Sequence, residues 1–278
     1  MIFQDKIVLV TGGSSGIGLA TAQAFAREGA HVWLLARDAE RLSCATRQVL
    51  DACRCSDQKC GVVSCDVSDD SQTVEAVARV IEQAGQPDIV VNSAGVVRPG
   101  YFHELDLPLY REMMEVNYFG ALRIIKAVVP GMMARRAGHI VNVASGAVLV
   151  PGFGYSAYAP SKHALRGLSD VLRIELKPYS VRVSVVYPPD TDTPQLTGEA
   201  PYKPFEAKRI YEATAIVSPE YVAGAILRGI KRGQYSITPG LEMKAAALAA
   251  RWLGDWQFSI LDRLIARARG VAKAERRG

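Results

Sequence analysis

The sequence predicts an α/β protein built on one doubly wound parallel sheet, and two regularities along the chain support this fold class. Short β-branched runs alternate with amphipathic segments of helix length from residue 6 to about residue 240. The β-branched runs are predominantly apolar, as strands of a parallel sheet covered on both faces usually are. Right-handed crossovers between such strands produce a Rossmann-type fold with helices on both faces, whose ligand crevice lies at the carboxyl ends of the strands.

The expected elements follow one another in order. Strands are expected at 6–12, 31–36, 61–67, 88–95, 138–145, 181–187 and 235–239. Helices are expected at 18–29, 38–53, 70–85, within 108–135, at 156–177 and at 219–232. No linker, repeat or low-complexity segment divides the 278 residues, so we expect one Rossmann-fold domain at 1–240 and a C-terminal amphipathic helical extension at 241–278.

Composition excludes several classes of protein. The chain is 49% hydrophobic and 22% charged, so it can bury a core and is not a disordered composition. It has no run of about 18 apolar residues, and a strand-like KIVLV begins at residue 6 where a signal peptide would have its apolar region. The five cysteines, all between residues 44 and 65, lack the paired C-x2-C spacing of a zinc site. We therefore expect no metal, reduced thiols and a cytoplasmic location.

A glycine-rich turn, TGGSSGIG at 11–18, stands between the first strand and the first helix. Glycines at this place allow a tight turn and a close approach of the backbone to a pyrophosphate, and the helix N-terminus offers its N–H groups to the negative charge. The alternative is a plain turn, but the position between strand and helix favours a dinucleotide. The expected cofactor contacts are Gly12, Ser14, Ser15, Gly16, Ile17 and Gly18.

The residues after the second strand select the cofactor. A dinucleotide without a 2′-phosphate is usually held there by an acidic residue, but this chain has Ala36 and Arg37. The Arg37 guanidinium can bind a phosphate, and Arg41 lies one helical turn further on. We therefore expect NADPH as the cofactor. The alternative is that Arg37 is simply an exposed residue at a helix start.

A tyrosine and a lysine four residues apart, Tyr158 and Lys162 in YSAYAPSK, share one face of the helix expected at 156–177. A phenol has a pKa near 10, and a neighbouring ammonium stabilises its phenolate. Lys162 is thus expected to lower the pKa of Tyr158 and make it a proton donor to a carbonyl. Ser145 ends the strand at 138–145, where its hydroxyl can hold the same carbonyl oxygen.

Together these residues resemble the short-chain dehydrogenase/reductase family over residues 5–195, in motifs that include TGGSSGIG, NSAG, MEVNYFG around Asn117 and YAPSK. The resemblance implies that Ser145 orients the substrate carbonyl, that Tyr158 donates the proton, and that Lys162 lowers the tyrosine pKa and bonds the nicotinamide ribose. It implies that Asn117 holds a water molecule between Lys162 and solvent. It also implies cofactor contacts from Asp66, Val67, Asn92, Ala94, Gly95, Tyr158 and Lys162.

The loop after the sixth strand, PPDTDTP, departs from the pattern of that family, in which the strand ends in Pro-Gly. Pro189 stands in place of the glycine and removes one N–H donor. Pro188, the Thr191 backbone and the Thr193 hydroxyl are the expected contacts of the nicotinamide. The loop, together with TGGSSGIG and LLAR, resembles the 3-ketodihydrosphingosine reductase branch of the family, whose members reduce a long-chain 3-keto amino alcohol with NADPH.

The expected function is therefore the NADPH-dependent reduction of 3-ketodihydrosphingosine to dihydrosphingosine, with a long-chain lipid ketone as the substrate. Asp190 or Asp192 is a candidate to meet the substrate ammonium, and the alternative is that both bond only the loop backbone. Two other functions remain open: a reductase of another bulky ketone of 3-ketoacyl, steroid or acyl-glycerone type, and a non-catalytic dinucleotide-sensing protein. The intact Ser, Tyr, Lys and Asn set argues against the last.

Relatives commonly pair through the helices near 110–135 and 156–177, so a homo-oligomer is also expected.

The C-terminal extension has an amphipathic helical pattern that is interrupted near Gly254. Residues 262–278 hold six Lys or Arg and two acids, whereas the net charge of the whole chain is +5. We expect this segment to make a peripheral contact with an anionic membrane surface, and not to bind nucleic acid. The alternatives are a frayed terminus, or a helix packed on the domain or on a second copy. The apolar stripe is formed by Trp252, Trp256, Ile260, Leu264 and Ala268.

Overall fold

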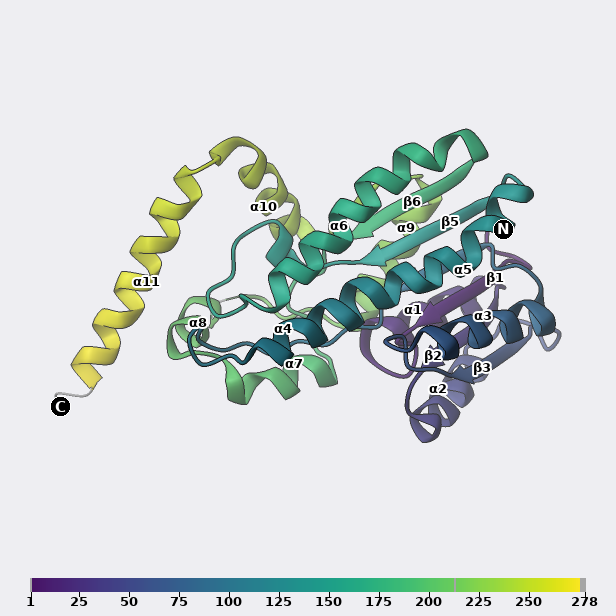
Figure 1. The fold of residues 1–278 in the computed structure, drawn as a ribbon, viewed down its shortest axis with the longest axis horizontal. Coiled ribbons are helices and arrows are strands. Elements are labelled where there is room, and N and C mark those ends of the chain that lie inside the picture. The colour runs from purple at the N-terminus through teal and green to yellow at the C-terminus, as the bar shows by residue number, and fades with distance from the viewer. Residues whose placement is uncertain (1, 213, 276–278) are drawn as a thin grey trace.

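In the computed structural model, which describes residues 2–212 and 214–275, seven parallel strands form one sheet (Figure 1). The strand order is β3-β2-β1-β4-β5-β6-β7, so the chain winds outward from β1 first in one direction and then in the other. The reversal between β1 and β4 opens the crevice of a doubly wound fold. The strands are β1 (Ile7–Thr11), β2 (His31–Ala36), β3 (Cys60–Ser64), β4 (Ile89–Asn92), β5 (Gly138–Val143), β6 (Val181–Val186) and β7 (Ser236–Ile237).

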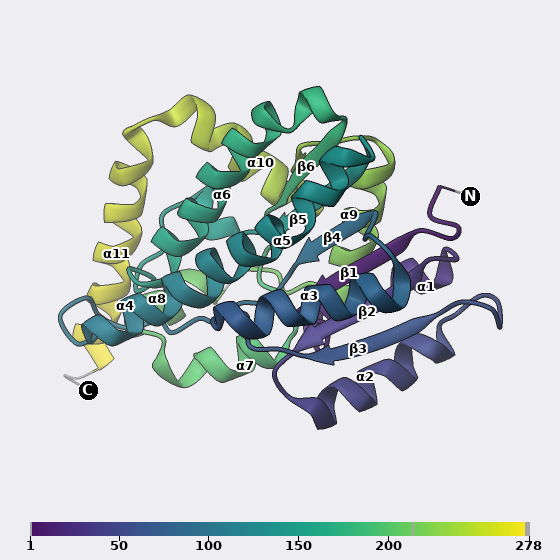
Figure 2. The same ribbon diagram turned by 45° about the vertical axis from the view of Figure 1, so that its right-hand side comes forward.

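Helices cover both faces of this sheet (Figure 2). One face carries α1 (Gly16–Arg27), α2 (Ala39–Asp51) and α9 (Pro219–Lys231). The other face carries α3 (Asp70–Ala84), α5 (Gly120–Ala134) and α6 (Tyr158–Glu175). The remaining helices are α4 (Leu107–Met114), α7 (Pro194–Glu199), α8 (Phe205–Tyr211), α10 (Gly240–Leu253) and α11 (Trp256–Glu275).

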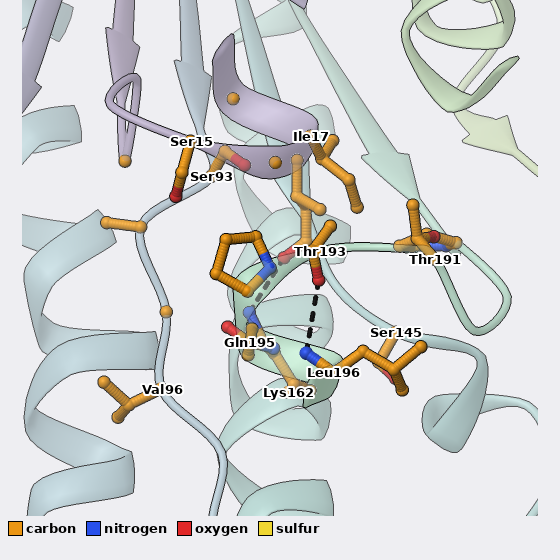
Figure 3. A pocket seen from close by; sticks show the side chains of 18 of the residues that line it. Ser15, Ile17, Ser93, Val96, Ser145, Lys162, Thr191, Thr193, Gln195 and Leu196 are labelled. Atoms are coloured by element: carbon orange, nitrogen blue, oxygen red, sulfur yellow. Dashed lines mark hydrogen bonds between the residues drawn. The ribbon is translucent and has the colours of Figure 1, made fainter. Parts of the chain in front are cut away.

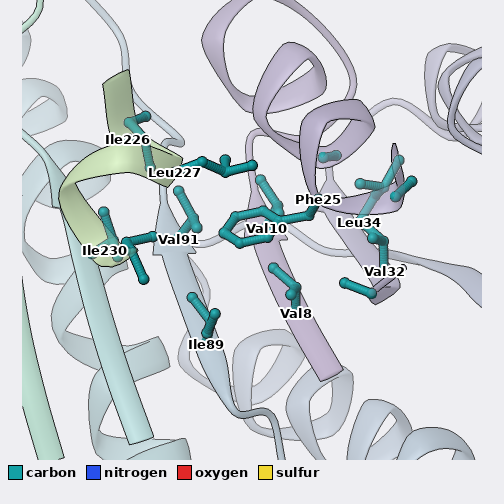
Figure 4. Packing of buried hydrophobic residues seen from close by; sticks show 14 of the residues in the cluster. Val8, Val10, Phe25, Val32, Leu34, Ile89, Val91, Ile226, Leu227 and Ile230 are labelled. Carbon is teal, nitrogen blue, oxygen red and sulfur yellow. The ribbon is translucent and has the colours of Figure 1, made fainter. Parts of the chain in front are cut away.

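The strands are buried on both sides because their residues alternate between two apolar clusters. In β1, Val8 and Val10 belong to the cluster under α1 and α9, whereas Leu9 belongs to the cluster under α3 and α5. Figure 4 shows Val8 and Val10 packed with Phe25 of α1 and Leu227 of α9. This double burial is the physical reason that the strands read as continuous apolar runs.

The predicted fold class is confirmed, and each expected strand and helix is present within a few residues of its predicted bounds. The region 108–135 divides into α4, a π-helical turn η1 (Glu115–Phe119) and α5. Helices α7 and α8 are not predicted by the sequence pattern, because three prolines between residues 194 and 204 obscure their periodicity.

The first helix of the extension packs on the carboxyl end of the sheet. A methyl group built on Gly146, just after β5, would lie 3.1 Å from Met243 Sδ of α10. Ala247 of α10 contacts the apolar cluster that includes Val185 and Tyr187 of the β6 end. The predicted domain boundary at residue 240 stays a prediction. Helix α10, which lies beyond that boundary, packs against residues of the predicted Rossmann-fold domain.

The second helix of the extension leads away from the sheet and passes α8 (Figures 1 and 2). The expected break is present at Gly254, which has φ 47°. The far part of α11 is fixed to α8: Arg269 Nε donates to Glu206 Oε1 at 2.9 Å, and Ala268 is only 6% exposed. The bend itself is open: Trp252 at the end of α10 is 78% exposed, and Trp256 at the start of α11 is 76% exposed. Residues 276–278 of the predicted extension lie outside the described residues.

No described helix has the combination of length and apolar character that crossing a bilayer requires.

Candidate active site

A cleft of about 640 Å³ opens at the carboxyl ends of the strands. It runs from Arg37, after β2, to Met243 on α10. Figure 3 shows Ser145, Lys162 and Thr191 around this space, with Ser15 and Ile17 at the start of α1 above them. Parallel α/β sheets bind their ligands at this edge, so the topology and the cleft agree.

The glycine-rich turn leaves no room for side chains. A methyl group at Gly12, whose φ is 66°, would lie 2.7 Å from the backbone nitrogen of Ala94, and one at Gly18 would lie 2.3 Å from the Gly12 carbonyl oxygen. Ser15 is the N-cap of α1, and its side chain makes no capping hydrogen bond. The first N–H groups of this 12-residue helix therefore face the cleft at the place where a phosphate would gain from them.

The far end of the cleft carries positive charge. Arg37 lies just beyond the end of β2, is 64% exposed, and has Nη1 3.8 Å from Asp66 Oδ2. Arg41 Nε lies 3.2 Å from Asp38 Oδ2, while the Asp38 carboxylate also accepts from Arg41 N and caps α2. Arg37 and Arg41 both line the cleft. A loose pair such as Arg37 and Asp66 leaves the arginine able to bind a phosphate.

The proposed catalytic side chains come from the end of β5 and the first turn of α6. Ser145 is the N-cap of a short 3₁₀ turn, and its Oγ accepts from Ala147 N at 3.1 Å. The Ser145 hydroxyl also acts on the Tyr158 phenol, whose pKa it lowers. Lys162 Nζ lies 5.8 Å from the centroid of the Tyr158 ring and donates to the Val143 carbonyl at 3.0 Å. Strand β5 and helix α6 thus bring all three groups to one place.

The pKa of Tyr158 differs from the expectation drawn from the sequence. Burial raises it to about 12, the charges of Glu199 and Asp190 add to the rise, and the hydrogen bond with Ser145 opposes it. Burial lowers the pKa of Lys162 to about 8. The net pKa of the phenol is therefore raised, not lowered, because desolvation outweighs the opposing effect of Ser145.

Asn117 lies behind the cleft wall. Its Nδ2 donates to the Val96 carbonyl and to Ser161 Oγ, and its Oδ1 accepts from Val96 N at 2.8 Å. It stands in the π-helical turn η1, a distortion that often marks functional sites. A methyl group at Gly95 would come within 3.2 Å of Lys162 Nζ and 3.1 Å of Asn117 Oδ1. Asn117 therefore positions the Gly95 backbone beside Lys162.

Asn92 is turned away from the cleft. It is buried at the end of β4, and its Nδ2 donates to Asn142 Oδ1 of β5 at 2.8 Å. Ser93 and Ala94, the next residues, line the cleft instead. The predicted cofactor contact at Asn92 is thus replaced by a side-chain bridge between two strands.

The loop after β6 forms the opposite wall. The Pro188 carbonyl accepts from Gly146 N at 3.0 Å, which ties the loop to the Ser145 side of the cleft. Thr191 forms an isolated parallel bridge with Val217. The two hydrogen bonds of this bridge use Asp192 N and the Asp190 carbonyl, so the N–H and C=O of Thr191 itself point away from Val217. Thr193 caps α7 by accepting from Leu196 N at 3.3 Å (Figure 3), and its hydroxyl hydrogen is left to donate.

Most of the predicted site residues line this single cleft. Those that do are Gly12, Ser14, Ser15, Gly16, Ile17, Gly18, Arg37, Arg41, Asp66, Val67, Ala94, Gly95, Ser145, Tyr158, Lys162, Pro188, Thr191 and Thr193. The structure adds residues that no motif indicates. Tyr155, Glu199, Tyr211 and Met243 line the cleft near Tyr158. Tyr155 lies in the segment YSAYAPSK and Met243 in the extension expected at 241–278, but the sequence assigns neither of them to the site.

Comparisons with known proteins agree with this site. The family described as short chain dehydrogenase matches residues 6–202. A 3-dehydrosphinganine reductase of Danio rerio is 41% identical over 234 residues, 84% of this chain and 70% of that protein. A 3-ketodihydrosphingosine reductase of Dictyostelium discoideum is 39% identical over 281 aligned positions, 95% of this chain and 83% of that protein. A solved short-chain dehydrogenase from Sphingobium yanoikuyae in complex with NADPH has a TM-score of 0.76 and 27% identity, covering 96% of this chain and 95% of that one.

Proposed function

The chain belongs to the short-chain dehydrogenase family, and from this membership we propose that it reduces 3-ketodihydrosphingosine to dihydrosphingosine with NADPH. It is an NADPH-dependent oxidoreductase. The observation that carries the proposed reaction is the meeting of Ser145, Tyr158 and Lys162 in one cleft, in a chain 41% identical to a 3-dehydrosphinganine reductase.

The cleft fits this cofactor. The glycine turn and the start of α1 would hold the pyrophosphate, since side chains at Gly12 or Gly18 would collide with backbone. Arg37 and Arg41 would hold the 2′-phosphate at the far end. Lys162, Thr191 and Thr193 would hold the nicotinamide half. When bound, NADPH supplies the hydride that reduces the ketone carbon.

The protein supplies the proton and the orientation. The Ser145 hydroxyl and the Tyr158 phenol hold the ketone oxygen between them. As the C=O π bond breaks, the Tyr158 O–H bond breaks and a new O–H bond forms on the substrate oxygen. A phenol with a pKa of about 12 is fully protonated at neutral pH and therefore ready to donate. The Lys162 ammonium stabilises the phenolate that remains, and Asn117 is predicted to hold a water molecule for the return of a proton.

Turnover of the lipid is the decisive test. Purified full-length protein is mixed with NADPH and 3-ketodihydrosphingosine, and both NADPH absorbance and formation of dihydrosphingosine are followed. We expect both signals to change in equal amounts. Reduction of other bulky ketones without reduction of this lipid would instead favour the 3-ketoacyl, steroid or acyl-glycerone alternative. NADPH binding without reduction of any ketone would favour a dinucleotide sensor.

The exposed part of the extension supports a peripheral membrane location. Trp252, Trp256, Phe258 and Ile260 are exposed together around the bend at Gly254. Aromatic and aliphatic side chains next to a basic segment suit the interface of an anionic membrane. We infer that the protein works in the cytoplasm at such a surface, where its lipid substrate would reside. Met243 belongs to both α10 and the cleft wall, so the same helix would stand between membrane and active site.

Helix α6 supports a homo-oligomer. Val171 and Ile174 are 52% and 69% exposed on its outer side, three residues apart. A methyl group at Gly167, one turn earlier, would meet nothing within 4 Å. This face can therefore receive a second copy of the chain closely. Light scattering coupled to size exclusion would show a dimer that Ile174→Lys dissociates, whereas an unchanged mass would argue against α6 as the interface.

A further inference from the structure

We propose that Asp190 binds the ammonium group of the amino-ketone substrate. This inference rests on the proposed function and names the chemical group by which the enzyme distinguishes its substrate from other long-chain ketones.

Asp190 lies in the cleft wall, two residues beyond Pro188 in the loop after β6. Its backbone carbonyl accepts from Val217 N at 3.0 Å, which fixes the loop independently of the side chain. The hydrogen bond between the Pro188 carbonyl and Gly146 N keeps this loop next to Ser145. Asp190 is therefore held on the side of the cleft where the substrate ketone must lie.

The groups around Asp190 belong to the same part of the cleft. Its charge acts on Tyr155, Tyr158 and Tyr211, and all three line the cleft. Tyr155 and Tyr211 stand with their ring centroids 6.2 Å apart, in an edge-to-face arrangement. Two aromatic rings beside a carboxylate form a suitable environment for an organic ammonium group.

Three carboxylates of the described chain occur near this end of the cleft, and they differ in what they already bind. Glu199 accepts from Lys203 Nζ at 2.7 Å and from Tyr155 Oη at 3.1 Å, so a cation already neutralises it. Asp192 is exposed and does not line the cleft. Asp190 lines the cleft and has no side-chain hydrogen bond or ion pair within residues 2–212 and 214–275. A partly buried carboxylate without a partner gains most from an incoming cation.

The chemistry of the substrate completes the argument. The amine of 3-ketodihydrosphingosine is on the carbon next to the ketone carbon, and an α-amino group has a pKa of about 8, so it is mostly charged at neutral pH. With the ketone oxygen on Ser145 and Tyr158, the ammonium must lie close to the reacting centre. Burial raises the pKa of Tyr158, and the charge of Asp190 adds to that effect. An ammonium bound to Asp190 offsets this charge and so favours the phenolate that proton donation leaves.

The experiment compares two substrates and three proteins. The substrates are 3-ketodihydrosphingosine and its 2-deamino analogue, which keeps the chain, the ketone and the 1-hydroxyl. The proteins are the wild type, Asp190→Asn, and Asp192→Asn as a control that removes a neighbouring charge outside the cleft. Thermal unfolding and NADPH binding are measured for each protein, so that a loss of structure is recognised.

We expect Asp190→Asn to lower kcat/KM for the amino ketone about 10- to 100-fold, as loss of a charged hydrogen bond does, and not to lower kcat/KM for the deamino analogue. Asp192→Asn should match the wild type on both substrates. Two results in a folded Asp190→Asn protein would overturn the role of Asp190. One is an equal decrease of kcat/KM for both substrates, and the other is a ratio of the two kcat/KM values that matches the wild type. Wild-type protein that reduces the deamino analogue but not the amino ketone would overturn the proposed function itself.

Discussion

The Lys162 ammonium donates a hydrogen bond to the backbone carbonyl of Val143 across 3.0 Å. Val143 is the last residue of β5, and Ser145 follows two residues later, so a single strand end positions both the lysine and the serine. The bond gives the buried ammonium one polar partner while its other N–H groups remain for the cofactor ribose. Burial nevertheless brings the pKa of Lys162 down to about 8, within the range of ordinary assays.

Ketone reduction is expected to decline above about pH 8. The charged form of Lys162 supports the Tyr158 phenolate, and this form is lost as pH rises through the lysine pKa of about 8. Tyr158 itself, with a pKa of about 12, does not titrate in that range. The profile of kcat/KM should be measured between pH 6 and 10 with a ketone that carries no amine, so that the substrate does not titrate. A rate that stays constant to pH 10 would contradict this assignment.

Replacing Tyr158 by phenylalanine should remove proton donation while keeping the ring. We expect kcat to fall about 10²- to 10⁴-fold, the usual contribution of a general acid. The Kd for NADPH, measured by the fluorescence of the reduced cofactor, should change little because the glycine turn and the arginines are untouched. Activity within tenfold of the wild type would mean that another group donates the proton.

Replacing Arg37 by alanine should weaken NADPH and spare NADH. Arg37 is 64% exposed, so solvent screens its interaction, and we expect the Kd for NADPH to rise about tenfold. The Kd for NADH, which has no 2′-phosphate, should be unchanged in calorimetry. Lys59→Ala is a suitable control, since it removes an exposed positive charge beyond the opposite end of β3. Equal weakening of both cofactors would show that Arg37 does not contact the phosphate.

Much of this molecule can be read from the sequence because the informative signals are local. The apolar run at 8–10 and the valine-rich run Val181–Val186 mark strands through their own composition. A parallel sheet brings together whatever follows each strand, so the chain positions of the glycine turn, Arg37 and Ser145 are enough to place all three in one cleft.

Other features depend on packing between distant segments and carry no local signal. Sequence spacing shows that Tyr158 and Lys162 are neighbours, but not that burial dominates the phenol pKa. Asn92 stands next to cleft residues in the chain, yet a partner on β5, Asn142, turns its amide into the sheet. Met243 lies about 85 residues after Tyr158 in the chain, and helix α10 brings it to the cleft. No sequence motif indicates that it belongs there.

The stability of the protein should fall in mild acid because of His139. Its Nε2 lies 2.8 Å from Ser184 Oγ, and the Ser184 hydroxyl donates to the Gln234 carbonyl, so the ring is the donor to the serine. Burial, assisted by the charge of Arg182, lowers the pKa of His139 to about 4. Between pH 6.5 and 4, the unfolded chain binds a proton that the folded chain does not, so the free energy of unfolding decreases as pH falls.

Urea denaturation at pH 7 and pH 5 measures this effect. Between pH 7 and pH 5, the free energy of unfolding of the wild type should fall by about 2 kcal/mol more than that of His139→Gln. This value is 1.36 kcal/mol for each of the about 1.5 pH units that separate pH 5 from the pKa of an unfolded histidine. Each protein serves as its own reference, so any general destabilisation by the substitution cancels. Identical losses in the two proteins would show that His139 titrates normally.

The exposed tryptophans of the extension should govern membrane binding. Trp252 and Trp256 flank the bend between α10 and α11 and are more than three quarters exposed, whereas the end of α11 is held on α8 by Arg269 and Glu206. Trp252→Ser with Trp256→Ser should lower co-sedimentation with phosphatidylcholine–phosphatidylserine vesicles at least about tenfold, because burial of two indoles is lost. Leu50→Ser with Val74→Ser, which removes exposed apolar residues from α2 and α3, should leave binding unchanged. If the tryptophan variant still sediments like the wild type, the extension serves the protein fold and not a membrane.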